Sequence, residues 1–139
     1  MQTQADADRL IQAGASSAHV VVTGNFKVDG VAKEGAQGQK ILVTLGMADR
    51  ILLIGASTHP GEETLLLNIF RRLRESVPRL LLLLAPRHPQ RFAEVEQLLK
   101  VGGYRYHKRS QPVNFTPTEV EVFLLDTLGE LVSFYPGAA

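Results

Sequence analysis

The 139-residue chain lacks cysteine, lacks a surplus of either charge and lacks apolar runs of membrane-spanning length. The absence of cysteine excludes a disulfide framework, a thiolate metal site and a cysteine nucleophile. The 15 basic and 14 acidic residues give a net charge near +1, so no polybasic surface is available for nucleic-acid phosphates. The leucine run 80–84 is far shorter than the ~20 apolar residues of a membrane helix, and residues 1–10 lack the pattern of a signal peptide. We therefore expect a soluble chain with no nucleic-acid partner.

From residue 50 onward, apolar runs alternate with amphipathic segments. The runs that end at Ala56 and Ala85 are apolar almost throughout, which predicts strands buried on both faces of a sheet. Helices are predicted over 62–77 and 89–101, because apolar residues recur there at helical spacing. The residues expected in the core include Phe70, Leu73 and Leu83. The expected strands are 50–56, 80–85, 104–107 and 120–125.

This alternation of strands and helices predicts an α/β fold. Strands buried on both faces require a parallel sheet covered by helices on two sides. Right-handed crossovers then favour a partial doubly wound, Rossmann-like sheet. Numbering the four strands along the chain, we expect the order 3-2-1-4.

Residues 1–38 differ in character from the rest of the chain. A short helix is predicted over 6–13 and a β-branched strand over 19–22, followed by a small, polar, glycine-rich segment up to residue 38. Such a composition is typical of a linker. We therefore divide the chain into 1–38 and 39–139.

Three turns should lie at the ligand-binding edge of this sheet, beyond the carboxyl ends of the strands. Two of them are similar, because the apolar runs before them end in His59-Pro60 and His88-Pro89. The prolines suit the first position of a helix, and free backbone N–H groups at a helix start form a natural anion site. The three turns are 57–61, 86–89 and 126–129.

Arg87 adds to the second turn a fixed positive charge with the fork geometry that suits phosphate or carboxylate. His59 and His88 are more simply capping or solvated residues, and two histidines without a third ligand do not predict a metal site. Glu62 and Glu63 are interpreted as part of a solvated helix face. No phosphate-loop or serine-hydrolase motif is present, so the residues themselves identify no catalytic group.

Four segments in this order and spacing resemble the 3-deoxy-D-manno-octulosonic acid (Kdo) transferase family. The resemblance extends from about residue 5 to 135. The segments are VTGNFKVD (22–29), ASTHPGEE (56–63), APRHPQRF (85–92) and DTLGEL (126–131).

The resemblance implies part of a GT-B glycosyltransferase that needs no metal or other cofactor and moves Kdo from CMP-Kdo to a lipid A precursor in lipopolysaccharide biosynthesis. In Gram-negative bacteria the whole enzyme is associated with the cytoplasmic face of the inner membrane. The implied site residues are Ser57 and Thr58 lining the donor cleft, Pro86 and Arg87 holding CMP, Thr127, Leu128, Gly129 and Glu130 contacting the nucleotide, and Asn25 and Lys27 at the junction between domains.

The chain also departs from the family pattern. The family's chains are much longer, and neither their catalytic carboxylate nor their G-G-H-N-x-L-E-P segment has a counterpart here. We therefore interpret 1–38 as the end of the acceptor domain with the linker, and 39–139 as the first half of the donor-binding domain, without catalytic residues. The alternatives are a stand-alone Rossmann-like binding or scaffolding module, or another GT-B sugar-nucleotide enzyme.

Overall fold

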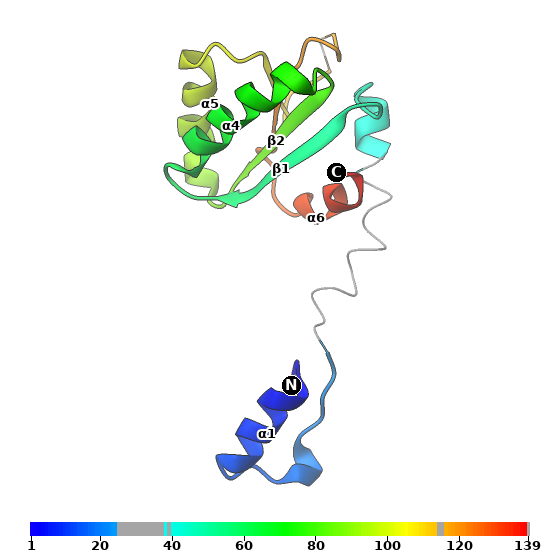
Figure 1. The fold of residues 1–139 in the computed structure, drawn as a ribbon, viewed down its shortest axis with the longest axis vertical. Coiled ribbons are helices and arrows are strands. Elements are labelled where there is room, and N and C mark those ends of the chain that lie inside the picture. Colours follow the sequence, from blue (N-terminus) through cyan, green and yellow to red (C-terminus); the bar gives the residue numbers. More distant parts are fainter. Residues whose placement is uncertain (25–37, 39, 114–115, 139) are drawn as a thin grey trace. The chain divides into compact units, whose positions relative to one another are not determined.

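The computed structural model describes residues 1–24, 38, 40–113 and 116–138. The chain divides into two compact units, 1–33 and 34–139 (Figure 1). Two residues with an expected role at a domain junction, Asn25 and Lys27, lie outside the described residues.

The first unit contains α1 (Gln4–Gln12) and a 3₁₀ turn, η1 (Ser17–His19). Thr3 caps the helix, because its side-chain oxygen accepts the backbone N–H of Asp6 at 3.2 Å. The prediction of a strand over 19–22 is wrong: η1 occupies its first residue, and residues 20–24 are assigned to no strand. In the described part of this unit, the N–H groups of His19 and Val20 donate to the preceding turn, and the backbone of Met1 pairs with Val21 and Thr23. One residue does not make a ladder, so β-branched side chains alone do not form a strand there.

The second unit is built on a four-stranded sheet in which every neighbouring pair is parallel. This confirms the predicted α/β class. The strands are β1 (Ile51–Thr58), β2 (Leu80–Pro86), β3 (Tyr106–Lys108) and β4 (Val122–Leu124).

The order of the strands is β1-β2-β4-β3 and not the expected 3-2-1-4. β4 is buried at all three residues, whereas β3 buries only its middle residue, His107. A strand that is apolar throughout suits the interior of a sheet, and one with polar flanks suits an edge. β4 therefore lies between β2 and β3, whereas the expected order had placed it at the edge beside β1. β3 is an edge strand as expected, but it pairs with β4 and not with β2.

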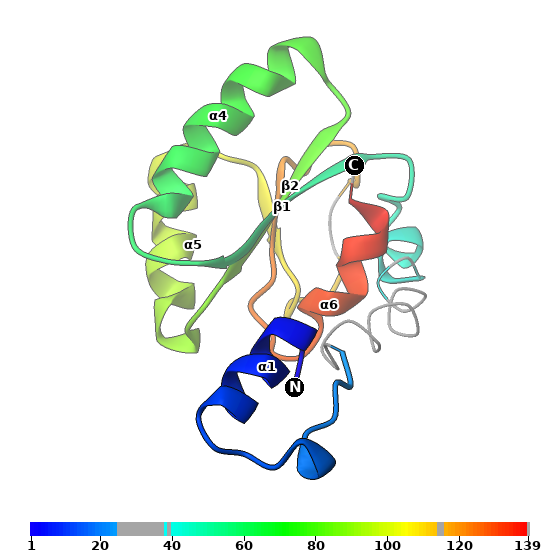
Figure 2. The ribbon, with the colours of Figure 1, turned by 60° about the horizontal axis from the view of Figure 1, so that its bottom comes forward.

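Helices cover both faces of the sheet, as predicted (Figure 2). One face carries α4 (Glu62–Ser76) and α5 (Phe92–Val101), the latter preceded by the 3₁₀ turn η2 (Pro89–Arg91). The other face carries a helical segment at 40–44 and α6 (Leu131–Phe134), which continues into η3 (Tyr135–Gly137). None of the described helices combines the length and the apolar character needed to cross a bilayer.

The buried side of α4 differs from the predicted one. Leu73, expected in the core, is 43% exposed, and Phe70 is 1% exposed. The buried residues of the helix are Glu63, Leu67 and Phe70, which follow one another at the i, i+4, i+7 spacing of a helix face. The inward face of α4 thus begins with a glutamate that the sequence pattern had placed in solvent.

Candidate functional site

The parallel sheet brings the three predicted turns to one edge, with the turn after β2 in the middle. The backbone N–H of Arg87 donates to the carbonyl of Thr58 at 3.0 Å, which joins the turns after β1 and β2. On the other side, the N–H of Leu125 donates to the carbonyl of Leu84 at 2.8 Å. The observed strand order therefore places Arg87 between the ends of β1 and β4, whereas the predicted order put the turn after β1 in the middle of the three.

The end of β1 is irregular at Ser57. The register with β2 shifts between Ala56 and Thr58, and Ser57 has a φ of 53°. A bulge of this kind redirects the backbone at the end of a strand, and a left-handed conformation is unfavourable for a serine. The backbone of the first candidate turn is thus held in an unusual shape by its surroundings.

Thr58 and Glu63 are buried together beside this bulge, at 2% and 1% exposure. The Thr58 hydroxyl donates to Glu63 Oε1 at 2.6 Å. Arg91 donates to both oxygens of the same carboxylate, at 2.7 and 3.1 Å. Burial opposes ionisation of Glu63, but the hydrogen bonds from Arg91 and Thr58 outweigh it and hold the pKa of this carboxyl below its ordinary value. Thr58, predicted to line a cleft, has its side chain engaged inside the protein.

Arg87 and the two histidines form the exposed part of the edge. Arg87, His59 and His88 are all exposed, and the imidazole rings lie edge to face with centroids 6.1 Å apart. Within the described part of the chain, the guanidinium of Arg87 has no hydrogen-bond or ion-pair partner. The N–H of His59 is not free for an anion, because it donates to Glu62 at 2.8 Å. The positive group open to a ligand in these two turns is therefore Arg87.

The third turn, after β4, is held by hydrogen bonds to the two residues that follow β3. Arg109 donates to Glu130 at 2.8 Å, and Ser110 donates to Asp126 through both its backbone and its hydroxyl. Thr127 donates to the carboxylate of Glu130 and not to a backbone group of α6. Thr127 and Glu130 thus close a turn, and neither side chain caps α6.

The outer part of this third turn is open to solvent. Leu128 is 73% exposed, and Gly129 has a φ of 84° that favours glycine. Pro86, at the end of β2, is buried. The exposed backbone of 128–129, rather than the paired carboxylate of Glu130, is the part of this turn that a ligand can reach.

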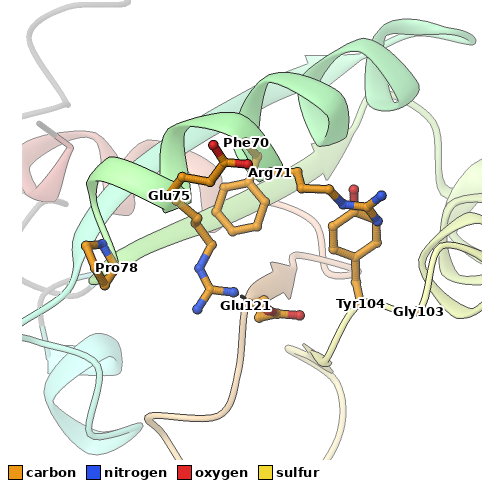
Figure 3. A pocket seen from close by; sticks show the side chains of 8 residues that line it. Phe70, Arg71, Glu75, Pro78, Gly103, Tyr104 and Glu121 are labelled. Carbon is orange, nitrogen blue, oxygen red and sulfur yellow. Dashed lines mark hydrogen bonds and ion pairs between the residues drawn. The ribbon is translucent and has the colours of Figure 1, made fainter.

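A pocket of about 420 Å³ lies at the opposite edge of the sheet (Figure 3). Pro78 precedes β2 and Glu121 precedes β4, so this pocket lies at the amino ends of the strands. Arg74 forms an ion pair with Glu121, and Arg71 lies over the ring of Tyr104 at 4.9 Å. Because its arginines are engaged by neighbouring side chains, we assign this pocket no ligand.

The residues that hold the candidate edge together were not predicted from the sequence. Glu63, Arg91, Arg109 and Asp126 are charged residues whose partners come from other elements. The position of Glu63 in line with Leu67 and Phe70 was the available signal, since a charge on an apolar helix face requires a partner. Among the described residues, no group of three histidine, aspartate or glutamate side chains could hold a metal ion.

Comparisons with known proteins give consistent results, although no family model matches the chain. A 3-deoxy-D-manno-octulosonic acid transferase of Bordetella pertussis is 39% identical over 99% of this chain and 32% of its own length. A transferase of the same name from Haemophilus influenzae is 42% identical over 82% of this chain and 27% of its own length. The chain therefore spans about a third or less of these relatives.

A solved structure shares the fold. The crystal structure of the C-terminal CMP-Kdo binding domain of WaaA from Acinetobacter baumannii matches with a TM-score of 0.66 and 28% identity, covering 77% of this chain and 55% of that one. The predicted resemblance is confirmed by both kinds of comparison. Along nearly its whole length, this chain is similar to one segment of the 3-deoxy-D-manno-octulosonic acid transferases.

Proposed function

We propose that this chain forms the donor-binding part of a Kdo transferase and that the carboxyl edge of its sheet binds the nucleotide of CMP-Kdo. The observation that carries the proposal is the exposed guanidinium of Arg87 at the centre of that edge, which has no hydrogen-bond or ion-pair partner among the described residues. Support comes from the solved CMP-Kdo binding domain with the same fold.

In this proposal each turn has a different role. Arg87 contacts the phosphate of CMP, because a guanidinium offers paired donors to phosphate oxygens. Leu128 and Gly129 approach the nucleotide through their exposed backbone, with Thr127 and Glu130 holding that turn in shape. The bulge positions Ser57 beside the donor. Thr58 and Pro86 are buried and support the backbone of the first and second turns without touching the donor through their side chains.

The whole enzyme would transfer Kdo from CMP-Kdo to a lipid A precursor at the inner membrane. Residues 1–38 would supply the end of the acceptor domain and the linker, with Asn25 and Lys27 at the junction, and 39–139 the first half of the donor domain. We assign no catalytic residue to this chain. A catalytic carboxylate supplied from elsewhere in the enzyme is consistent with the engagement of Glu63 and Glu130 in internal contacts.

The proposal is tested by titrating the chain with CMP while recording amide NMR shifts. We expect the shifts to concentrate at Ser57, Arg87, His88 and the 127–130 turn. Replacing Arg87→Ala should weaken CMP binding about ten- to a hundred-fold, because a hydrogen bond to a charged group contributes roughly 1.5–3 kcal/mol. The matched control, Arg72→Ala, removes an exposed arginine from the outer side of α4 and should leave the affinity unchanged.

Three outcomes would reject the proposal. An Arg87→Ala variant that binds CMP as tightly as the wild type would reduce the second turn to a helix start without a ligand. Tighter binding of UDP than of CMP would favour another sugar-nucleotide enzyme. A lack of binding by either nucleotide would favour the scaffolding alternative.

A further inference from the structure

The network of Thr58, Glu63 and Arg91 joins three separate elements beneath the candidate edge. Thr58 ends β1, Glu63 lies in the first turn of α4, and Arg91 ends η2. Their relative exposures are 2%, 1% and 9%, so all three are enclosed by protein. In the sequence they are separated by as many as 33 residues. The fold has therefore brought an ion pair into its interior directly behind the turns that we propose to bind the donor.

Stability alone does not account for this ion pair. Removing two charges from water is costly, and replacing a buried ion pair by apolar residues of similar volume is often neutral or stabilising. Leu67 and Phe70 show that the same face of α4 accepts apolar side chains. An apolar pair makes no directional contacts. The three hydrogen bonds to the Glu63 carboxylate, in contrast, fix the orientations of the Thr58 hydroxyl and the Arg91 guanidinium.

Arg91 transmits this geometry to Arg87 through one carbonyl group. The carbonyl oxygen of Thr58 accepts a hydrogen bond from Arg91 Nη1 at 3.2 Å and from the backbone N–H of Arg87 at 3.0 Å. Pro86 has no N–H, so the N–H of Arg87 is the first donor after the end of β2. The position of the Arg87 backbone is thus tied to Thr58, and that of Thr58 to Glu63 and Arg91.

We propose that Glu63 and Arg91 are positioning residues that hold the Thr58 carbonyl, and through it the Arg87 turn, in the geometry that receives the donor's anionic group. The effect of this positioning on ligand affinity depends on the proposed function. Glu63 does not touch the ligand. It keeps the 57–58 backbone in place despite the left-handed conformation of Ser57.

The experiment compares three variants of the full chain by amide hydrogen exchange. Glu63→Gln removes the charge with little change in shape. Arg91→Lys keeps the positive charge, but one ammonium group cannot reproduce the planar fork that reaches both Glu63 and the Thr58 carbonyl. Glu75→Gln is the control, because this exposed glutamate lies at the other end of α4. The reporter is the amide of Arg87, and the reference is the amide of Leu82, which donates to Glu121 at the other end of β2.

We expect the Arg87 amide to exchange about ten-fold faster relative to Leu82 in both Glu63→Gln and Arg91→Lys, as for loss of one hydrogen bond, and to be unchanged in Glu75→Gln. An unchanged ratio in the first two variants overturns the proposal. Equal acceleration of both amides also overturns it, because that result describes a network that only stabilises the fold. If Glu63→Gln does not fold, Arg91→Lys decides.

A parallel CMP titration separates this inference from the proposed function. With a wild type that binds CMP and a weakened Arg87→Ala variant, we expect Glu63→Gln to raise the dissociation constant of CMP by about ten-fold. Unchanged affinity in Glu63→Gln overturns the positioning role while the donor site stands. If the wild type does not bind CMP, the proposed function fails. The exchange ratio of Arg87 to Leu82 then still supports or overturns the dependence of the Arg87 backbone on Glu63 and Arg91.

Discussion

Two leucines, Leu83 in β2 and Leu73 in α4, differ in burial and should therefore differ in their contribution to stability. Leu83 in β2 is fully buried, with 0% exposure, between the two helical layers, and Leu73 in α4 is 43% exposed. Both were predicted as core residues. Their environments differ because α4 turns Glu63, Leu67 and Phe70 towards the sheet and leaves Leu73 near solvent.

We predict that Leu83→Ala lowers the free energy of unfolding by roughly 2–5 kcal/mol, because it leaves a cavity in a packed interior. Leu73→Ala should lower it by less than about 1 kcal/mol, since Leu73 is 43% exposed and its loss leaves no enclosed cavity. Urea unfolding followed by circular dichroism measures both changes. Similar losses for the two variants would contradict the observed orientation of α4.

Glu63 was predicted to be exposed and is buried, which is the reverse of what is found for Leu73. Its charge indicated a solvated position, yet it is 1% exposed and receives hydrogen bonds from Thr58 and Arg91. A sequence pattern records the charge of a residue but not its partner, and Arg91 is 28 positions away. This is why the candidate ligand residue Arg87 could be predicted and the network behind it could not.

At the scale of elements, charged side chains attach the short edge strand β3 to the sheet. Glu96 in α5 accepts hydrogen bonds from Tyr106 and Lys108 of β3, at 2.8 and 2.9 Å. Lys108, Lys100 and Tyr106 together lower the pKa of Glu96 from its ordinary 4.5 to about 2. β3 has only three residues, so this contact with α5 is a substantial part of what holds it.

The lowered pKa predicts a defined acid sensitivity. Because the folded state keeps Glu96 ionised more readily than the unfolded state, its contribution is complete above pH 4.5 and is lost as the pH falls from 4.5 towards 2. The contribution is at most about 3 kcal/mol, from 1.36 kcal/mol per pKa unit. In Glu96→Gln the free energy of unfolding should be lower at pH 7 and should fall less between pH 4.5 and 2. An identical pH profile for wild type and Glu96→Gln contradicts the prediction, and Glu75→Gln is the control.

Arg50 joins neighbouring strands at their amino ends, as Glu96 joins β3 to α5. Its guanidinium donates to the carbonyls of Arg79, Leu80, Pro117 and Val120. The start of β1 is thereby joined both to β2 and to the segment that leads into β4. These contacts support the observed order, in which β4 lies beside β2.

At the scale of the whole molecule, β1 has one edge paired with β2 and a second edge with little pairing. Along that second edge the described residues provide a single bridge, between Leu52 and Ala138. β1 is eight residues long and carries no charged side chain. A long apolar edge strand without charges is prone to pair with another chain.

We therefore predict concentration-dependent association of two copies through β1, measured by sedimentation velocity. Ala56 is the exposed position of this strand, and Ala56→Lys should shift the equilibrium towards the monomer, because a lysine on an edge disfavours strand pairing. A wild type that stays monomeric at all accessible concentrations, or an Ala56→Lys variant that associates equally well, would contradict a role for this edge.

The sequence by itself determined the local periodicity, and with it the class of the fold. Continuous apolar runs require burial on both faces, so β1, β2 and the helices after them were predicted nearly at their observed bounds. The motif segments were also sufficient to identify the related family, because they depend only on residue order and spacing. The position of Arg87 at the carboxyl edge of the sheet could be predicted for the same reason, since the carboxyl ends of parallel strands share one edge.

Tertiary structure decided the features that depend on contacts between distant segments. The position of β4 beside β2, the rotation of α4 and the burial of Glu63 each rest on partners far along the chain, such as Arg50 with Val120 and Glu63 with Arg91. Local propensity carries no information about such partners, because a strand order or an ion pair is selected by the free energy of the assembled core. For the same reason, the observed strand order puts the Arg87 turn in the middle of the three candidate turns, where the predicted order had put the turn after β1.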